Sequence, residues 1–264
     1  MNAPSHAGTA LITGASSGIG ATYARRLAAR GFNLLLVARN ESRLRQLADE
    51  LATTHGVQAD LLSADLTQTD EIERVANRLR SDEQITLLVN CAGVALNGSL
   101  AEADIESSQQ LLQLNLLALT MLSSAAAVRF SLAGRGAIIN IGSVVSLLPE
   151  RFNAIYSASK AYVLSLSQSM HAELSHSGVQ VQVVLPGVTR TEIFERSGGS
   201  LAQIPPGMVM EVEDLVDAAL RGFDQGELVT IPSLPDSAEW QALTQARLQL
   251  APNLSRNRPA ERYH

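Results

Sequence analysis

The chain has 264 residues, of which 46% are hydrophobic and 17% are charged, and its net charge is −6. That size suits one large α/β domain or two small ones, and the acidic balance without any basic cluster argues against nucleic acid as the main ligand. One cysteine allows no internal disulfide, and we see no signal peptide and no apolar run longer than a strand. We therefore expect a cytoplasmic protein without a membrane or metal site.

Short apolar runs alternate with longer amphipathic segments along the chain. The runs are rich in Leu, Ile and Val without clean alternation, which is typical of strands buried on both faces. Strands are predicted at 10–13, 33–38, 58–63, 86–90, 136–141, 179–185 and 228–231. Helices are predicted at 18–30, 41–54, 68–81, 104–133, 155–176 and 212–224. The alternation predicts one doubly wound domain over residues 1–264, with a parallel sheet of about seven strands and helices on both faces.

Three segments depart from this alternation. Residues 188–210 have weak periodicity and contain two consecutive prolines, which favours a substrate loop or lid. The stretch after Ala238, which holds Trp240, is expected to be helical as far as Leu250. Residues 253–264 are polar and irregular, which is typical of a loosely held tail.

A glycine-rich turn follows the first predicted strand and opens the first predicted helix. Glycines permit a tight turn and let backbone N–H groups approach a pyrophosphate, while the helix N-terminus adds partial positive charge. This context is the one that a dinucleotide fingerprint requires. The sequence therefore predicts a dinucleotide site that includes Gly14, Ser16, Ser17, Gly18, Ile19 and Gly20.

The same turn also fits G-x-S-x-G, the nucleophile elbow of α/β-hydrolases. That fold places the serine on a later strand, with an acid and a histidine downstream. Here the pattern lies on the first strand, His171 and His176 fall within a predicted helix, and His264 is the last residue. The dinucleotide interpretation is favoured.

The end of the second predicted strand indicates which dinucleotide binds. An acidic residue there selects the ribose of NAD, whereas an arginine suits the 2′-phosphate of NADP. Ala38 holds the acidic position and Arg39, whose guanidinium is a planar fork of donors, follows it. We expect NADP(H) to be preferred over NAD(H). Whether Arg43, one helical turn on, assists or is only a surface residue stays open.

Two further strand ends add candidate cofactor contacts. Asp65 and Leu66 follow the third strand, where a carboxylate could accept from the adenine amino group, and Asp65 is equally suited to cap the next helix. Asn90, Ala92 and Gly93 end the fourth strand, where small residues would let the backbone pass close to the cofactor.

Tyr156 and Lys160 lie four residues apart on one predicted helix. Residues at that spacing share a helix face, so an ammonium is placed beside a phenol. A neighbouring cation favours the phenolate and lowers the pKa of a tyrosine from about 10. Tyr156 is therefore a candidate general acid/base near neutral pH.

With Asn115 and Ser143, these motifs resemble the short-chain dehydrogenase/reductase family from about residue 8 to residue 191. Only Cys91 departs from its pattern, at a position where asparagine is common. The resemblance implies that Tyr156 exchanges a proton with a carbonyl or alcohol oxygen, and that Lys160 binds the nicotinamide ribose and lowers the tyrosine pKa. It also implies that Ser143 orients the substrate oxygen and Asn115 anchors a relay water. The remaining implied cofactor contacts are Pro186, Gly187, Thr189 and Thr191.

Substrate walls are expected from loops after the strands, and the candidates there are apolar, which suggests a lipophilic ketone, aldehyde or secondary alcohol. They are Val94, Ala95, Leu96, Leu147, Leu148, Phe152, Phe194, Met208 and Met210. A non-catalytic dinucleotide sensor is the alternative, although such proteins typically lack the tyrosine or the lysine. A sugar-nucleotide epimerase would need a larger C-terminal domain than the segment after Gly187 provides.

Assembly is the last expectation. The helices near 115–133 and 155–176 carry small residues that would let two copies pair through an isologous four-helix interface. These are Ala118, Ser123, Ala126, Ser165, Ser169 and Ala172. The resemblance implies a homodimer or homotetramer.

Overall fold

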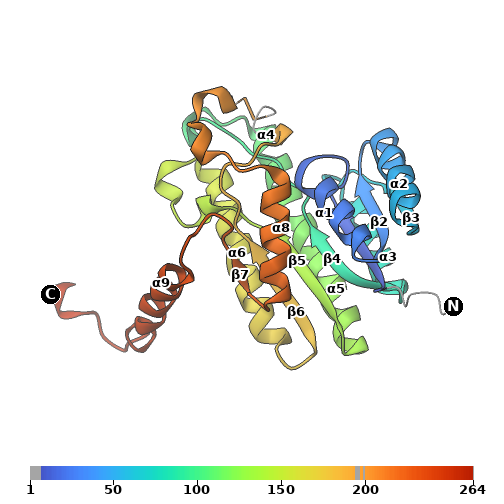
Figure 1. Ribbon diagram of the computed structural model, residues 1–264. Helices are drawn as coiled ribbons and strands as arrows, with labels where there is room; N and C mark the ends of the chain where they lie inside the picture. The colour runs from blue at the N-terminus through green and yellow to red at the C-terminus, as the bar shows by residue number, and fades with distance from the viewer. Residues whose placement is uncertain (1–6, 194–196, 199, 264) are drawn as a thin grey trace. The chain divides into compact units, whose positions relative to one another are not determined.

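The computed structural model describes residues 7–193, 197–198 and 200–263 (Figure 1). Their contacts divide into two compact units, Met1–Pro232 and Ser233–His264, so the single domain expected over 1–264 stays a prediction. The first unit holds one parallel sheet of seven strands in the order β3-β2-β1-β4-β5-β6-β7. The strands are β1 (Thr9–Thr13), β2 (Asn33–Ala38), β3 (Ala59–Ser63), β4 (Ile85–Asn90), β5 (Gly136–Ile141), β6 (Val179–Val184) and β7 (Val229–Thr230).

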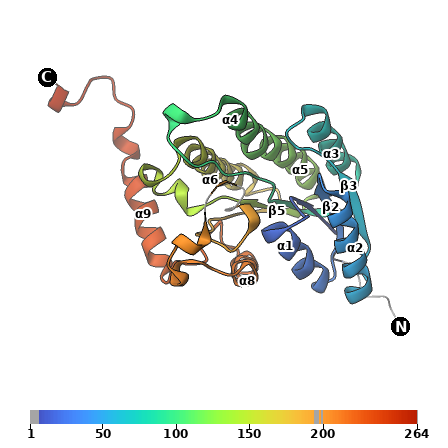
Figure 2. The ribbon, with the colours of Figure 1, turned by 90° about the horizontal axis from the view of Figure 1, so that it is seen from above.

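Helices cover both faces of this sheet, which confirms the predicted fold class (Figure 2). One face carries α1 (Gly18–Ala29), α2 (Glu41–His55) and α8 (Val212–Asp224). The other carries α3 (Thr69–Ser81), α5 (Leu119–Ala133) and α6 (Ala154–Leu174). The strand order reverses between β1 and β4, and ligands of such sheets bind at the carboxyl ends of the strands at that point.

The strands form because their side chains are buried on both faces. Ala10 and Ile12 of β1 belong to the core beneath α1 and α2, whereas Leu11 belongs to the core beneath α3 and α5. The near-continuous apolar runs in the sequence are therefore two alternating sets, one for each layer of helices.

The longest helical run joins α4 (Ile105–Leu112) to α5 through a π-helical segment, Gln113–Ala118. Among the described residues, the run Ile105–Ala133 alone is long and apolar enough to span a membrane by composition, with a mean hydropathy of 1.7 over its best window. Core helices of globular proteins pass the same test, and 44% of that window is buried against this fold. The sequence was expected to contain no apolar run longer than a strand, and this helical run departs from that expectation.

The small residues proposed for a helical interface divide into two groups. Ala118, Ser123 and Ala126 are buried within the protein's own core, which corrects their assignment to an intermolecular face. Helix α5 packs its small residues inward because they allow close approach to α3 and the sheet. Its outer face instead exposes Val128 (58%) and Leu132 (83%). Ser165, Ser169 and Ala172 of α6 are exposed as expected.

The second unit contains α9 (Ser237–Gln249) and two short 3-10 turns, Ala251–Asn253 and Glu261–Tyr263. The Asp236 carboxylate caps α9 by accepting a hydrogen bond from the Ala238 N–H at 2.8 Å. No residue of α9 is buried. The predicted helical stretch after Ala238 is present and ends one residue before Leu250.

Candidate active site

The turn between β1 and α1 requires glycine. Gly14 and Gly18 have φ angles of +68° and +51°, a region that side chains with a Cβ rarely adopt. A Cβ on Gly14 would lie 3.0 Å from the Cα and the backbone N of Ala92. A Cβ on Gly20 would collide with the carbonyl oxygen of Gly14. The turn is therefore a close-packed backbone cradle at the switch point of the sheet.

Thr13 holds this cradle against the neighbouring strand. Its hydroxyl accepts hydrogen bonds from the N–H groups of Cys91 and Ala92, both at 3.0 Å. The same hydroxyl donates to the Val89 carbonyl at 3.4 Å. Thr13 was not among the predicted site residues, although it directly precedes Gly14 of the glycine-rich turn.

The residues around the cradle fit a dinucleotide. Ser17 precedes α1 without capping it through its side chain, and the first turn contains no acidic residue. The N–H groups of that turn therefore have no competing side-chain anion, as a pyrophosphate seat needs. The Thr191 methyl group would lie 3.3 Å from a Cβ on Gly18, so the chain after β6 meets the same turn. The structure thus brings the predicted glycines and Thr191 together.

The adenosine end of the seat has two arginines in different situations. Arg39 is exposed, and its side chain has no hydrogen bond or ion pair with any residue of the described ranges. Arg43 pairs with Glu192, the guanidinium Nη1 lying 3.1 Å from Oε2. Asp65 accepts from the backbone N–H (3.0 Å) and the hydroxyl (2.8 Å) of Thr67, which closes the turn that leads into α3. Asp65 therefore stabilises the turn before α3 without capping the helix, since Gln68 holds the N-cap position, and its contact with the adenine stays a prediction.

The side-chain amide of Asn90 forms hydrogen bonds within the protein core. The buried amide donates to the Ser123 hydroxyl at 3.0 Å and to the side-chain oxygen of Asn140 at 2.9 Å. Asn140 in turn donates to the Ser167 hydroxyl of α6 at 3.0 Å. This chain of hydrogen bonds ties β4 and β5 to α5 and α6. The side-chain oxygen of Asn90 is also buried, and it has no hydrogen-bond partner among the described residues.

The four predicted catalytic residues come from three segments. Ser143 follows β5, and its hydroxyl accepts from the Val145 N–H (3.3 Å) and donates to the Pro186 carbonyl (3.4 Å). Tyr156 and Lys160 lie on α6, with the ammonium 5.8 Å from the centre of the phenol ring. The Asn153 side chain starts α6 by accepting from the Tyr156 N–H at 2.9 Å. This cap sets the position of Tyr156 on the first turn of its helix.

Asn115 lies within the π-helical segment between α4 and α5, and its side chain is buried. Its carbonyl oxygen accepts from the Val94 N–H at 3.0 Å, and its amide donates to the Val94 carbonyl at 2.9 Å. The amide also donates to the Ser159 hydroxyl at 3.3 Å. Asn115 thus joins the loop after β4 to α6, the helix that carries the predicted Tyr156 and Lys160, and π-helical turns of this kind are frequent at functional sites.

Burial dominates the acid–base properties of the catalytic pair. It raises the pKa of the Tyr156 phenol, while the nearby Ser143 hydroxyl acts in the opposite direction. Burial also lowers the pKa of Lys160 to about 8. The net shift of the Tyr156 pKa is therefore upward, opposite to the lowering expected from Lys160. The Lys160 ammonium donates to the Ile141 carbonyl at 3.0 Å, and burial is the largest cause of the shift at the phenol.

Lys160→Met is expected to raise the melting temperature at pH 7 and to raise it less at pH 10. The folded-state pKa of about 8 lies below the ordinary lysine value of 10.5, so the unfolded chain binds more protons between these values and stability rises with pH across that window. Below it, the buried charge costs on the order of 2–4 kcal/mol, at about 1.4 kcal/mol per pKa unit.

Thermal unfolding of both proteins at both pH values measures this difference. Lys160 is the only lysine of the chain, so no other lysine contributes to it. Equal shifts at pH 7 and pH 10 would show that the ammonium is not destabilised by burial.

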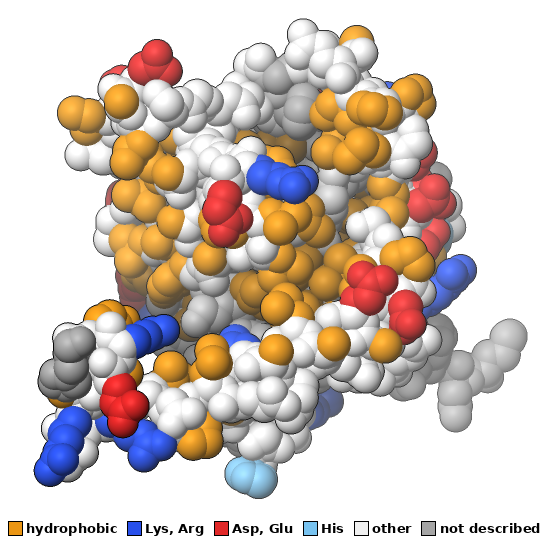
Figure 3. Space-filling model, turned by 90° about the vertical axis from the view of Figure 1, so that its left-hand side faces the viewer, with side chains coloured by type: hydrophobic (Ala, Val, Ile, Leu, Met, Phe, Trp, Pro, Cys, Tyr) orange, Lys and Arg blue, Asp and Glu red, His pale blue; other side chains and the backbone are white. Residues whose placement is uncertain are grey.

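The candidate substrate walls are mostly open. Leu148 and Phe152 are each 48% exposed and Met208 is 64% exposed, while Val94, Ala95, Leu96 and Leu147 are half-buried. Met210 packs against the core beneath α1, and Phe194 lies outside the described residues. Figure 3 shows hydrophobic side chains spread over one face, with few charged ones among them.

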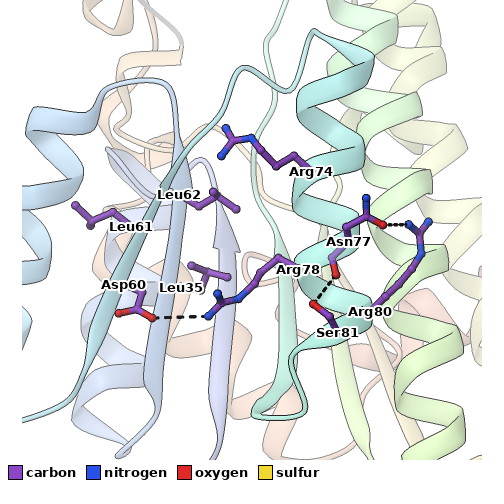
Figure 4. A pocket seen from close by; sticks show the side chains of 9 residues that line it. All are labelled: Leu35, Asp60, Leu61, Leu62, Arg74, Asn77, Arg78, Arg80 and Ser81. Atoms are coloured by element: carbon purple, nitrogen blue, oxygen red, sulfur yellow. Dashed lines mark hydrogen bonds and ion pairs between the residues drawn. The ribbon is translucent and has the colours of Figure 1, made fainter.

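A hollow lies away from these residues, between the edge strand β3 and α3 (Figure 4). Its arginines have partners of their own, since Arg78 lies 3.8 Å from Asp60 and Arg80 donates to Asn77 at 2.8 Å. No catalytic candidate lines it. Within the described ranges, no group of three His, Cys, Asp or Glu side chains could hold a metal ion.

Comparisons with known proteins agree with this geometry. A family model described as short chain dehydrogenase matches residues 8–200. The chain is 31% identical over 228 residues to the 3-oxoacyl-acyl-carrier-protein reductase of Escherichia coli, covering 84% of this chain and 92% of that protein.

Two solved structures are similar over almost the whole chain. One is a short-chain dehydrogenase from Sphingobium yanoikuyae in complex with NADPH, with 50% identity, a TM-score of 0.95, and coverage of 97% of this chain and 100% of that chain. The other is a bulky-bulky ketone specific alcohol dehydrogenase from Comamonas testosteroni, with 46% identity, a TM-score of 0.90, and coverage of 98% and 99%.

Proposed function

Because the chain belongs to the short-chain dehydrogenase family, we propose that it is an NADP(H)-dependent oxidoreductase that interconverts lipophilic ketones or aldehydes and their alcohols. One observation carries this proposal: Tyr156, Lys160 and Ser143 lie at the carboxyl ends of the strands, at the same end of the sheet as the glycine-rich turn. In that turn the backbone is packed so closely that Gly14 and Gly20 have no room for a side chain. The alternative, a dinucleotide sensor without catalysis, is disfavoured because both the tyrosine and the lysine are present.

In the reducing direction, the Tyr156 phenol donates its proton to the substrate oxygen. A phenol whose pKa is raised by burial keeps that proton at neutral pH, which supports its role as the acid. The Ser143 hydroxyl donates a hydrogen bond to the same oxygen as negative charge develops there. The bound nicotinamide supplies the hydride. In the oxidising direction, the phenolate of Tyr156 removes the alcohol proton.

Lys160 has two roles in this proposal: it binds the nicotinamide ribose, and it takes part in returning a proton to Tyr156. Its ammonium would lie 3.7 Å from a Cβ on Gly93, so the small residue leaves room for a ligand hydroxyl there. With a pKa of about 8, the lysine exchanges protons readily near neutral pH. The Asn115 amide is engaged by Val94 and Ser159, so the relay water is assigned to its backbone carbonyl.

The substrate class is inferred from the exposed apolar rim and from the relatives. Leu148, Phe152 and Met208 offer hydrophobic surface to a large ligand. The Arg190 guanidinium pairs with Glu211 at 2.8 Å, so its charge is already compensated and does not favour an acidic substrate. The Comamonas testosteroni relative is specific for bulky-bulky ketones, which supports two large substituents on the carbonyl.

We expect NADPH to be preferred over NADH by at least tenfold in kcat/KM. The Arg39 guanidinium, which has no partner in the part of the chain that the structure describes, is available for the 2′-phosphate, and a bidentate contact of that kind contributes about 1.5–3 kcal/mol. The experiment is an oxidation assay of NADPH and NADH with a panel of ketones and aldehydes, using wild type and Arg39→Ala. Equal kcat/KM for the two cofactors would refute the assignment, and the alanine variant should narrow the gap.

We also propose a homodimer or homotetramer in the cytoplasm. The exposed Val128 and Leu132 of α5 offer apolar surface to a second copy, and α6, on the same side of the sheet, exposes small residues. Light scattering tests the assembly, and a mass near 28.1 kDa would show a monomer.

A further inference from the structure

The ion pair between Arg43 and Glu192 joins two segments beside the adenosine end of the cofactor seat. Arg43 lies in the first turn of α2, shortly after the end of β2, where the adenosine ribose of the cofactor is expected. Its Nη1 lies 3.2 Å from Oε1 and 3.1 Å from Oε2 of Glu192. Glu192 follows Thr191, whose methyl group packs over Gly18 at the start of α1. The pair therefore links the chain after β6 to the helix expected to face a 2′-phosphate.

The two arginines near this position differ in their availability. Arg39 has no side-chain partner among the described residues, whereas the guanidinium of Arg43 already holds a carboxylate. Both members of the pair are 44% exposed, so solvent and a ligand anion can reach them. Exposed carboxylate–guanidinium pairs are weak, whereas a phosphate offers a guanidinium stronger charge-assisted hydrogen bonds. A 2′-phosphate can therefore displace Glu192 from Arg43.

We propose that Glu192 competes with the cofactor 2′-phosphate for Arg43 and thereby limits the preference for NADP(H). This inference rests on the proposed function, because it assumes that NADP(H) occupies the seat. Binding of NADPH opens the pair and recruits Arg43 alongside Arg39, whereas NADH leaves the pair closed. Glu192 is thus a specificity-determining residue that acts through Arg43.

The test is a set of NADPH and NADH dissociation constants, measured by fluorescence titration of the full-length protein without substrate. Glu192→Gln should tighten NADPH binding by about two- to fivefold, the range that corresponds to an exposed ion pair, and leave NADH binding unchanged. Arg43→Ala should weaken NADPH binding alone. In the double variant, removal of the carboxylate should have no further effect, because its competitor is gone.

Glu211→Gln is the matched control. Glu211 pairs at 2.8 Å with Arg190, which lies two residues before Glu192. The side chain of Arg190 is 55% exposed and that of Glu211 is 50% exposed, so this ion pair is as open to solvent as the pair under test. This variant should change neither dissociation constant. A change equal to that of Glu192→Gln would indicate a general effect of surface charge and overturn the proposal.

Two further results would also overturn it. If Glu192→Gln has no effect on NADPH binding, the pair does not compete with the phosphate. If it tightens NADPH binding equally in the Arg43→Ala background, Glu192 repels the phosphate directly and does not act through Arg43. A wild type that binds both cofactors equally would instead refute the cofactor choice in the proposed function, which is a distinguishable failure.

Discussion

Tyr156→Phe is expected to reduce turnover at least a hundredfold while leaving NADPH binding nearly intact. Phenylalanine removes only the hydroxyl that transfers the proton, and general acid catalysis contributes about 10²–10⁴-fold to a rate. The phenyl ring still occupies the position of the phenol ring on α6, so packing around residue 156 is kept. The measurement combines kcat on an accepted ketone with an NADPH titration of the same purified protein.

Tyr162→Phe provides the control on the same helix. Its hydroxyl lies 2.8 Å from the Thr120 hydroxyl, and the side chain is 37% exposed. The same chemical change at this position should leave kcat unchanged. If Tyr156→Phe retains more than a tenth of the wild-type rate on any accepted substrate, Tyr156 is not the acid.

Gly20→Ala is expected to weaken NADPH binding by more than a hundredfold. The new methyl group would collide with the Gly14 carbonyl oxygen, and its three nearest neighbours are all backbone atoms, so the turn itself must move. A shift of the turn displaces the N–H groups that face the pyrophosphate. Because several charge-assisted hydrogen bonds are lost together, at about 1.5–3 kcal/mol each, two such bonds account for this factor.

Gly207→Ala is the control for that substitution. A Cβ at Gly207 meets no atom of the described residues within 4 Å, and the backbone there is not in the left-handed region. This variant should bind NADPH like wild type. Far-UV circular dichroism of both variants separates a displaced turn from global unfolding, and unchanged NADPH binding by a folded Gly20→Ala protein would show that the cradle does not seat the cofactor.

The fold could be predicted from sequence because its signals are local and periodic. Buried parallel strands need continuous apolar runs, and the helices between them need amphipathic segments, so both appear in the order of the chain. The boundaries of β2 (Asn33–Ala38) and β5 (Gly136–Ile141) agree with the prediction, because a change in composition marks each end. The glycine cradle was equally readable, since its close backbone approach permits no other residue.

The sequence by itself thus determined the family, the doubly wound sheet and the identity of the catalytic candidates. It could not determine which way a side chain turns or which distant residue it meets. Only the tertiary structure turned Ser123 inward to Asn90, placed Asn115 in a π-helical turn against Val94, and set Glu192 against Arg43. It also reversed the expected pKa shift of Tyr156. These features depend on burial and on contacts between residues far apart in the chain, and no local pattern of residue types encodes either of them.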